Sequence, residues 1–250
     1  MALPLNDPTG GWDASAEAWI RFVDEGDINR THLLDPVMLE VCGRVNGRRV
    51  LDIGCGEGRF CRMLKPRGAL TTGVDLAAKF VEVAKRRDAQ GQYLVADAVK
   101  LPFPDATFDL CVSYVALVDI KDFRMAIAEM ARVLQPGGRV AFANLQCFTT
   151  VNPNGAIKKP NRKKLHLPVY DNADERAIIG KWRGIEVLQY HRPLEAIMQA
   201  FLAAGLVLRR FIEPVATPTA RRDQPNFKDE QTTPIFVVME WVKPADARKA

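Results

Sequence analysis

Three acidic side chains and a run of glycines occupy positions where they could bind a small polar ligand. Asp52 comes two residues before the first glycine of Gly54-Cys55-Gly56-Glu57-Gly58, and Asp75 and Asp97 follow two later apolar runs. Glycine lets the backbone turn tightly and approach a ligand closely. A carboxylate beside such a turn would repel a pyrophosphate but could hold an amino group or an ordered water. The pattern therefore favours a cationic ligand without phosphates.

The spacing of the glycines distinguishes this turn from a dinucleotide-binding turn. A dinucleotide-binding turn has the pattern G-x-G-x-x-G and places a pyrophosphate at a helix N-terminus. This chain has G-x-G-x-G, preceded by the apolar run that contains Asp52. Taken alone, the motif also fits a tight strand-to-helix turn with a purely structural role. The stretch Val50 to Gly58 resembles the first motif of the class I S-adenosylmethionine-dependent methyltransferases.

The resemblance implies S-adenosylmethionine as the cofactor and assigns residues to it. An acid at the end of a second strand, here Asp75, would hold both hydroxyls of the ribose. Asp97-Ala98 stands where the family binds the adenine amino group, and the loop from Leu101 to Asp109 is also similar to the family. The residues expected to bind the cofactor are Trp19, Arg30, Asp52, Gly54, Cys55, Gly56, Asp75, Leu76, Asp97, Ala98 and Tyr114.

An alternating series of strands and helices must position these residues. Helices are expected between the strands, for example over Arg59 to Leu64 and over Phe123 to Leu134, where apolar residues recur at helical spacing. Such alternation predicts an α/β fold with a doubly wound, seven-stranded, mostly parallel sheet, in which the resemblance makes the seventh strand antiparallel. A ligand on such a sheet lies outside the carboxyl ends of the strands. The predicted strands are Val50–Ile53, Leu70–Val74, Tyr93–Ala96, Phe108–Tyr114, Arg139–Leu145, Leu206–Ile212 and Ile235–Val242.

The chain is expected to form a single domain over residues 1–250. Residues 12–45 would form an N-terminal helical cap, in which Asp35-Pro36 is a helix start and Trp19 either packs on the sheet edge or lies over the cofactor. Residues 46–145 would form the cofactor-binding core, and 146–184 an insertion that covers the substrate. Residues 185–242 would add a C-terminal helix and a strand pair.

Composition indicates an ordinary soluble globular protein. Hydrophobic residues make up 48% of the 250 residues, charged residues 26%, and the net charge is +5. Five cysteines without C-x-x-C spacing indicate reduced thiols, so neither a disulfide framework nor a metal site is expected. The sequence shows neither a signal peptide nor an apolar run long enough to span a bilayer. We expect a cytoplasmic protein with no membrane partner.

Methyl transfer from a sulfonium is an in-line displacement that needs positioning but no nucleophilic side chain. A base is required only if the acceptor must lose a proton, and histidine is the usual choice. Many relatives have a histidine pair just beyond the fourth strand, but this chain reads Val115-Ala116-Leu117-Val118-Asp119 there. Of the three histidines, His191 is the candidate base because it lies beside the substrate-covering segment. The catalytic residue itself is not predicted.

We therefore expect an S-adenosylmethionine-dependent methyltransferase that transfers a methyl group to an O, N or C atom of a small-molecule acceptor. Two alternatives remain: a non-catalytic S-adenosylmethionine-binding module, and an RNA methyltransferase that uses the basic run Lys158 to Lys164. A nucleic-acid partner is not favoured, because the net charge is small and no aromatic residue interrupts the run. The sequence does not specify the acceptor or the oligomeric state.

Overall fold

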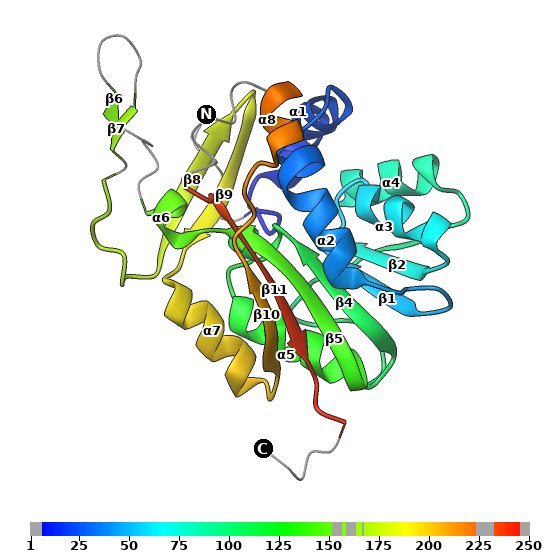
Figure 1. The fold of residues 1–250 in the computed structure, drawn as a ribbon. Coiled ribbons are helices and arrows are strands. Elements are labelled where there is room, and N and C mark those ends of the chain that lie inside the picture. Colours follow the sequence, from blue (N-terminus) through cyan, green and yellow to red (C-terminus); the bar gives the residue numbers. More distant parts are fainter. Residues whose placement is uncertain (1–6, 152–156, 159–163, 167, 224–232, 246–250) are drawn as a thin grey trace.

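The protein is described here by a computed structural model, which covers residues 7–151, 157–158, 164–166, 168–223 and 233–245. A seven-stranded sheet runs through the molecule in the order β10-β11-β5-β4-β1-β2-β3 (Figure 1). All neighbours in it are parallel except β11, which is antiparallel to both β10 and β5. The expected mostly parallel sheet with one reversed strand is confirmed. Its strands are β1 (Arg49–Ile53), β2 (Leu70–Asp75), β3 (Gln92–Val95), β4 (Phe108–Tyr114), β5 (Leu134–Leu145), β10 (Val207–Ile212) and β11 (Phe236–Val242).

Helices cover both faces of the sheet and form a three-layer structure. One face packs against α2 (Asp35–Cys42), α3 (Arg59–Leu64) and α4 (Ala78–Arg87). The other packs against α5 (Phe123–Val133) and α7 (Leu194–Ala203). Strands β1 and β4 are apolar on both sides because both of their faces are buried, as is typical of parallel sheets. The shorter helices among the described residues include α6 (Cys147–Thr150), α8 (Pro218–Asp223) and the 3₁₀ turn η2 (Lys65–Arg67).

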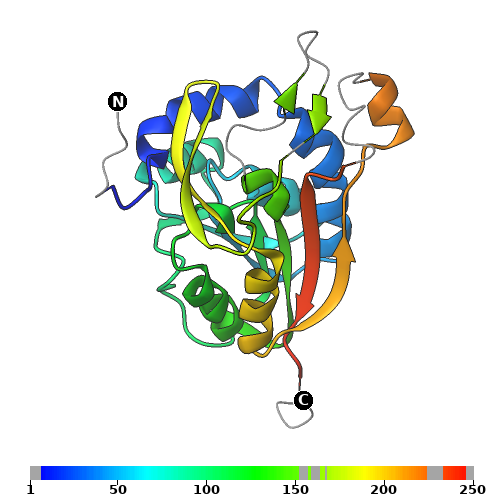
Figure 2. The ribbon, with the colours of Figure 1, turned by 90° about the vertical axis from the view of Figure 1, so that its left-hand side faces the viewer.

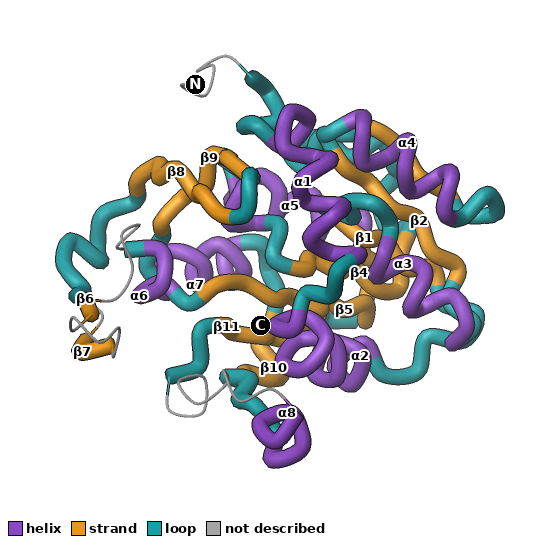
Figure 3. Tube along the Cα trace, turned by 90° about the horizontal axis from the view of Figure 1, so that it is seen from above, coloured by secondary structure: helices purple, strands orange, loops and turns teal. Residues whose placement is uncertain are grey.

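A roof lies over the carboxyl ends of the parallel strands. It consists of α1 (Trp12–Asp24) and a two-stranded hairpin of β8 (Arg176–Trp182) and β9 (Ile185–His191), which run beside each other (Figures 2 and 3). Ser15 joins the two parts, because its hydroxyl donates to the Glu186 carbonyl at 3.0 Å and accepts from the Glu186 amide at 3.1 Å. The Leu188 amide donates to the Gly10 carbonyl at 2.8 Å. We use the word roof below for α1 and this hairpin.

The hairpin is the main element that the sequence analysis did not identify. Its chain reversal falls at Arg183 and Gly184, which both have positive φ angles of 45° and 81°. Such angles suit a two-residue hairpin turn, but arginine at the first position masks the signal that glycine or asparagine would give. Tyr190 and His191 end strand β9, and Arg192-Pro193 connects this strand to helix α7. The hairpin spans the expected boundary at residue 184, and the division of the chain stays a prediction.

Helix α2 begins at Asp35 as expected, with Pro36 in its first turn, but Asp35 is not its N-cap. The π-helix η1 (Arg30–Leu34) runs directly into α2, so the chain is already helical when it reaches Asp35. The Asp35 side chain does not cap α2; it forms an ion pair with Arg59 and accepts a hydrogen bond from the Tyr114 hydroxyl at 2.7 Å. Tertiary partners therefore determine the role of this residue, which its local sequence context does not reveal.

Two further expectations from the sequence concern the basic run Lys158 to Lys164 and membrane-spanning segments. The basic run lies outside the described residues, apart from its ends in the short strands β6 (Ile157–Lys158) and β7 (Lys164–His166). Among the residues that the structure describes, no helix has both the length and the apolar character needed to cross a membrane.

We predict that Phe201→Ala lowers the free energy of unfolding by about 3–5 kcal/mol, the usual loss for a buried phenylalanine. Phe201 is fully buried and stacks on Trp241, with ring centroids 4.8 Å apart and planes 8° apart. Leu202→Ala on the same helix is the matched control, since Leu202 is 49% exposed. Urea titration measures both variants, and equal losses would contradict this view of the core.

Candidate functional site

The glycine turn connects β1 to α3 at the carboxyl edge of the sheet. The amides of Gly54 and Cys55 both donate to the Val74 carbonyl, at 2.8 and 3.0 Å, which fixes the turn against β2. Gly54 has a φ of +71°, and a Cβ there would lie 2.4 Å from the Cβ of Ala116. This glycine is therefore required by the protein's own packing. The sequence analysis had attributed the glycines to a ligand's approach.

Gly56 is the glycine of this turn that faces the roof. A Cβ on Gly56 would lie 3.9 Å from the indole nitrogen of Trp19, and the Gly56 amide donates to Asp75 at 2.8 Å. The next strand end in the sheet, at β4, is strained, because Val115 is β-branched and has a φ of 58°. Unusual backbone geometry of this kind concentrates at functional sites.

Asp52 lies below the glycine turn and is only 2% exposed. The Cys61 thiol donates to Oδ2 at 3.5 Å, while Oδ1 has no partner among the described residues. Burial raises the pKa of Asp52 to about 7, and the nearby Asp75 adds to the rise. A buried carboxylate oxygen without a partner is unfavourable, so this atom is suited to a donor from a ligand or a water.

Asp75 ends β2 and contributes a second carboxylate. Its two oxygens accept the amides of Gly56 at 2.8 Å and Ala77 at 2.9 Å, which orient the carboxyl group. Each oxygen retains a free lone pair, so the pair of oxygens could still accept from two adjacent hydroxyls. Burial raises the pKa of Asp75 to about 6 despite these amides.

Arg30 provides a positive charge over the acids. Its guanidinium lies 4.7 Å from the Trp19 ring centroid and 5.1 Å from that of Tyr114, and it acts on Asp52 electrostatically. Its Nε is 3.4 Å from Asp27. Tyr114 supports Arg30 with its ring, while its hydroxyl is bound to Asp35. A guanidinium held between two rings, with donors remaining, is suited to a carboxylate.

Three more predicted cofactor residues, Leu76, Asp97 and Ala98, lie at the open edge beside β2 and β3, whereas Cys55 lies in the glycine turn. Leu76 is 36% exposed, and Asp97 is exposed with Oδ1 accepting from the Val99 amide at 3.1 Å. Ala98 is partly buried and packs against the core. Cys55 is 7% exposed, and burial raises the pKa of its thiol. The structure thus provides an exposed apolar side chain and a carboxylate at one end of the acid-lined site.

His191 is fully buried and both of its ring nitrogens have partners. Nδ1 lies 2.8 Å from the Thr150 hydroxyl and Nε2 lies 3.1 Å from the Asn172 carbonyl. Burial lowers its pKa. These contacts join β9 to α6 and to the segment before β8, so His191 has a structural role and we do not propose it as the base.

The structure brings in one acid that the sequence analysis missed. Asp119 ends the 3₁₀ turn η3 (Leu117–Asp119), just beyond β4, and Gln189 of the roof donates to it at 3.1 Å. The one sequence signal was an isolated acid in the apolar stretch Val115 to Ile120. The sequence did not indicate which residue would contact Asp119, because its partner Gln189 lies in the hairpin that was not predicted.

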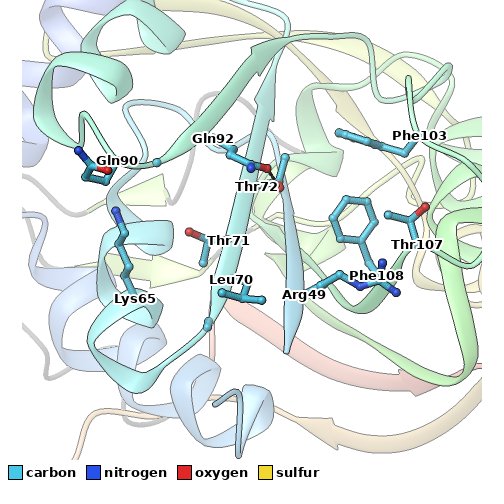
Figure 4. A pocket seen from close by; sticks show the side chains of 12 residues that line it. Arg49, Lys65, Leu70, Thr71, Thr72, Gln90, Gln92, Phe103, Thr107 and Phe108 are labelled. Atoms are coloured by element: carbon cyan, nitrogen blue, oxygen red, sulfur yellow. Dashed lines mark hydrogen bonds between the residues drawn. The ribbon is translucent and has the colours of Figure 1, made fainter. Parts of the chain in front are cut away.

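A hollow of about 420 Å³ lies elsewhere on the molecule (Figure 4). It is lined by the first residues of three strands, among them Arg49, Leu70 and Gln92. These residues are at the amino ends of β1, β2 and β3, on the sheet edge opposite the glycine turn. The hollow is therefore separate from the acid-lined site.

The acid-lined site fits the expected cofactor. Asp52 has a buried oxygen without a partner among the described residues, and Asp75 has two oriented oxygens. The positively charged guanidinium of Arg30 lies beside two aromatic rings. A ligand with an amino group, a diol and a carboxylate would find a partner for each group. S-adenosylmethionine carries these groups and a sulfonium, whose positive charge the acids would also favour.

Comparisons with known proteins agree with this geometry. A family model described as a methyltransferase domain matches residues 51–142. A malonyl-[acyl-carrier protein] O-methyltransferase from Serratia marcescens is 41% identical over 99 residues, which are 40% of this chain and 39% of that protein. An O-methyltransferase from Aspergillus nomiae is 30% identical over 154 residues, 58% of this chain and 68% of that protein.

Solved structures share the fold. An S-adenosylmethionine-dependent methyltransferase from Mesorhizobium loti matches with a TM-score of 0.77 at 24% identity, over 87% of this chain and 99% of that one. The chain spans about two fifths of the length of the first curated relatives that it matches.

We predict that Asp52→Asn stabilises the free protein more at pH 8 than at pH 5. The folded pKa of about 7 exceeds the unfolded value of about 3.9, so the native state binds the proton more tightly and wild-type stability falls as pH rises between those values. Because asparagine does not ionise, the variant does not lose stability in this way as pH rises. At roughly 2–4 °C per kcal/mol for a domain of this size, the extra gain in Tm should be several degrees.

Thermal melts of both proteins at the two pH values test this. The exposed Asp174→Asn is the control and should show a difference near zero. A Tm gain for Asp52→Asn that is independent of pH would contradict a raised pKa of Asp52 in the folded protein.

Proposed function

The chain belongs to the class I S-adenosylmethionine-dependent methyltransferase family, and from that premise we propose that it transfers a methyl group from S-adenosylmethionine to an O, N or C atom of a small-molecule acceptor. The observation that carries the proposal is the grouping of Arg30, Asp52 and Asp75 around the glycine turn. These residues come from η1, β1 and β2, and a purely structural turn would need none of their charges.

Each charged group has a distinct part in holding the cofactor. Arg30 would bind the carboxylate of the methionine moiety, and the free oxygen of Asp52 would accept from its amino group, directly or through a water. Asp75 would accept from the two ribose hydroxyls, since the Gly56 and Ala77 amides already orient its carboxyl group. Leu76 and Asp97 would contact the adenine at the open edge.

When bound, the cofactor supplies a methyl group already activated by the sulfonium. The protein's part is to bring the acceptor atom to it in line and at close range, which is worth roughly 7–11 kcal/mol in favourable cases. The roof would exclude water from this region, because Trp12 and Trp19 of α1 form an aromatic layer with ring centroids 5.4 Å apart. Dry surroundings also strengthen the interactions of Arg30 and the acids.

Two observations support a small acceptor over RNA. The charged groups at the described site are mainly acidic, whereas RNA binding requires a basic surface. The relatives named above carry O-methyltransferase names. What the Serratia protein acts on is a property of that protein; for this chain the acceptor is part of the proposal.

We predict that Arg30→Ala and Asp75→Ala each weaken binding of S-adenosylhomocysteine by about 10- to 100-fold. The reason is that a hydrogen bond to a charged group contributes roughly 1.5–3 kcal/mol. Isothermal titration calorimetry measures the affinities. Arg21→Ala is the matched control on α1, since Arg21 is exposed, and it should bind like the wild type.

The melting temperature measured with and without S-adenosylhomocysteine tests whether the protein binds the cofactor product. The wild type should gain several degrees at millimolar ligand, because a ligand that binds only the folded state stabilises it. The absence of a gain would refute the proposed function. A gain without methyl transfer across a broad acceptor panel would instead support the non-catalytic binding module.

A further inference from the structure

Asp119 is an acid at the covered end of the site that cofactor binding does not require. It follows β4 by five residues and is partly buried, and it lies close enough to Asp75 for the two charges to interact. Its hydrogen-bond partners are in the roof: Gln189 of β9 donates to Oδ1 at 3.1 Å, and the Trp12 indole also donates to the carboxyl group. Asp119 therefore faces the space between the strand ends and the roof.

The loop that carries Asp119 is held rigidly by Arg192. The guanidinium of Arg192 donates to the carbonyls of Leu117 at 2.6 Å and Lys121 at 3.1 Å, and also to that of Ile120. The guanidinium lies over the Phe123 ring, 4.2 Å from the ring centroid, and Arg192 is only 5% exposed. Rigid support of this kind is what a reacting group requires.

The charge around Asp119 is unfavourable for an anionic acceptor. The largest charge interactions of Asp119 are with Asp75, which repels its charge, and with Arg192, which attracts it. Three N–H groups of Arg192 are bound to backbone carbonyls of the Asp119 loop, which directs this cation toward the loop. A carboxylate placed beside Asp119 would meet the negative charges of Asp119 and Asp75.

Aromatic rings that pack against one another lie beside Asp119. Trp12 lies between three rings, with centroids 5.4 Å from Trp19, 5.8 Å from Phe80 and 6.3 Å from Trp182. Tyr190, which is partly buried on β9, interacts electrostatically with Asp119 and lies over Arg192. Flat aromatic ligands pack well against such rings.

We propose that the acceptor is a neutral aromatic hydroxyl and that Asp119 is the catalytic residue that accepts its proton. The inference rests on the proposed function and deepens it by naming the acceptor class. In the transfer, the hydroxyl oxygen attacks the methyl carbon in line, so a C–O bond forms and the C–S bond breaks. The electron pair of the broken bond stays on sulfur, and the hydroxyl proton moves to Asp119, which later releases it to water.

The acidity of Asp119 suits this role. Burial raises its pKa to about 7, further raised by Asp75, while the Gln189 and Trp12 hydrogen bonds and the charge of Arg192 oppose the rise. A base with a pKa near the working pH combines an ionised fraction with useful proton affinity. Because the base must be ionised, the rate of methylation should rise with pH through about 7, and Asp119→Asn should remove that dependence.

The first test uses binding of small probes, which does not depend on turnover. With the protein saturated by S-adenosylhomocysteine, we would titrate phenol, aniline and benzoate and follow the Trp12 indole signal by ¹⁵N NMR, assigned with Trp12→Phe. Phenol should bind at least tenfold more tightly than benzoate, and Asp119→Asn should reduce that ratio to near one.

Three outcomes would overturn the inference: benzoate binding as tightly as phenol, a preference for aniline over phenol, or the absence of any shift in the Trp12 signal. An unchanged phenol-to-benzoate ratio in Asp119→Asn would also overturn it. Binding of S-adenosylhomocysteine by wild type and Asp119→Asn, measured separately, distinguishes these failures from failure of the proposed function. The cofactor affinity should be similar in the two proteins.

A second test uses turnover with methyl-labelled S-adenosylmethionine and an acceptor collection that contains phenols, amines and carboxylic acids. Methyl ethers of phenols are the expected products, and Asp119→Asn should lower kcat by about 10²- to 10⁴-fold. Methyl esters as the main products, or a variant with the wild-type kcat and pH profile, would refute the role of Asp119.

Discussion

Three carboxylates at the carboxyl edge of one sheet are kept largely out of water, and much of the structure serves to make that possible. Asp52 is the last residue but one of β1, Asp75 ends β2 and Asp119 follows β4, and burial raises the pKa of each. Like charges in a region of low polarity repel strongly. The protein limits the repulsion with amide donors, with the guanidinium groups of Arg30 and Arg192 and with partial protonation, which leaves a site electrostatically prepared for a cation.

The surrounding elements place polar partners where the acids need them. The glycine turn supplies its Gly56 amide to Asp75, and the roof supplies Gln189 to Asp119. Arg59 and Tyr114 both bind Asp35, which fixes α2 against the start of α3 and holds the ring on which Arg30 rests. The site is therefore assembled from several segments that are distant in the sequence, and each contributes a specific charge or hydrogen bond.

The sheet was predictable from the sequence because local patterns determine it. Apolar runs ending in acids, glycine turns and helical spacing identified β1, β2 and β4, and the structure places these strands side by side in the sheet. The sites of Asp52 and Asp75 at adjacent strand ends follow from that order. The glycines were identified correctly, but the reason for Gly54 was not. A Cβ at this position would collide with Ala116, whose place depends on the strained end of β4.

The roof was less predictable because its signals are tertiary. The hairpin of β8 and β9 turns at Arg183-Gly184, which does not resemble the common glycine or asparagine turns. Without the hairpin, Gln189 could not be connected to Asp119, and His191 stood out as a titratable residue near the substrate. The buried partners of His191, Thr150 and Asn172, could be recognised only once α6 and β9 were placed together.

The hydrogen bonds between α1 and β9 make the roof observable in solution. The Leu188 amide is bound to the Gly10 carbonyl and the Glu186 amide to the Ser15 hydroxyl, so both lie on the edge of β9 that faces α1. Their amide hydrogens exchange with solvent only when α1 separates from the hairpin. Hydrogen exchange at these two positions would therefore time the opening of the covered end, independently of any reaction that takes place beneath it.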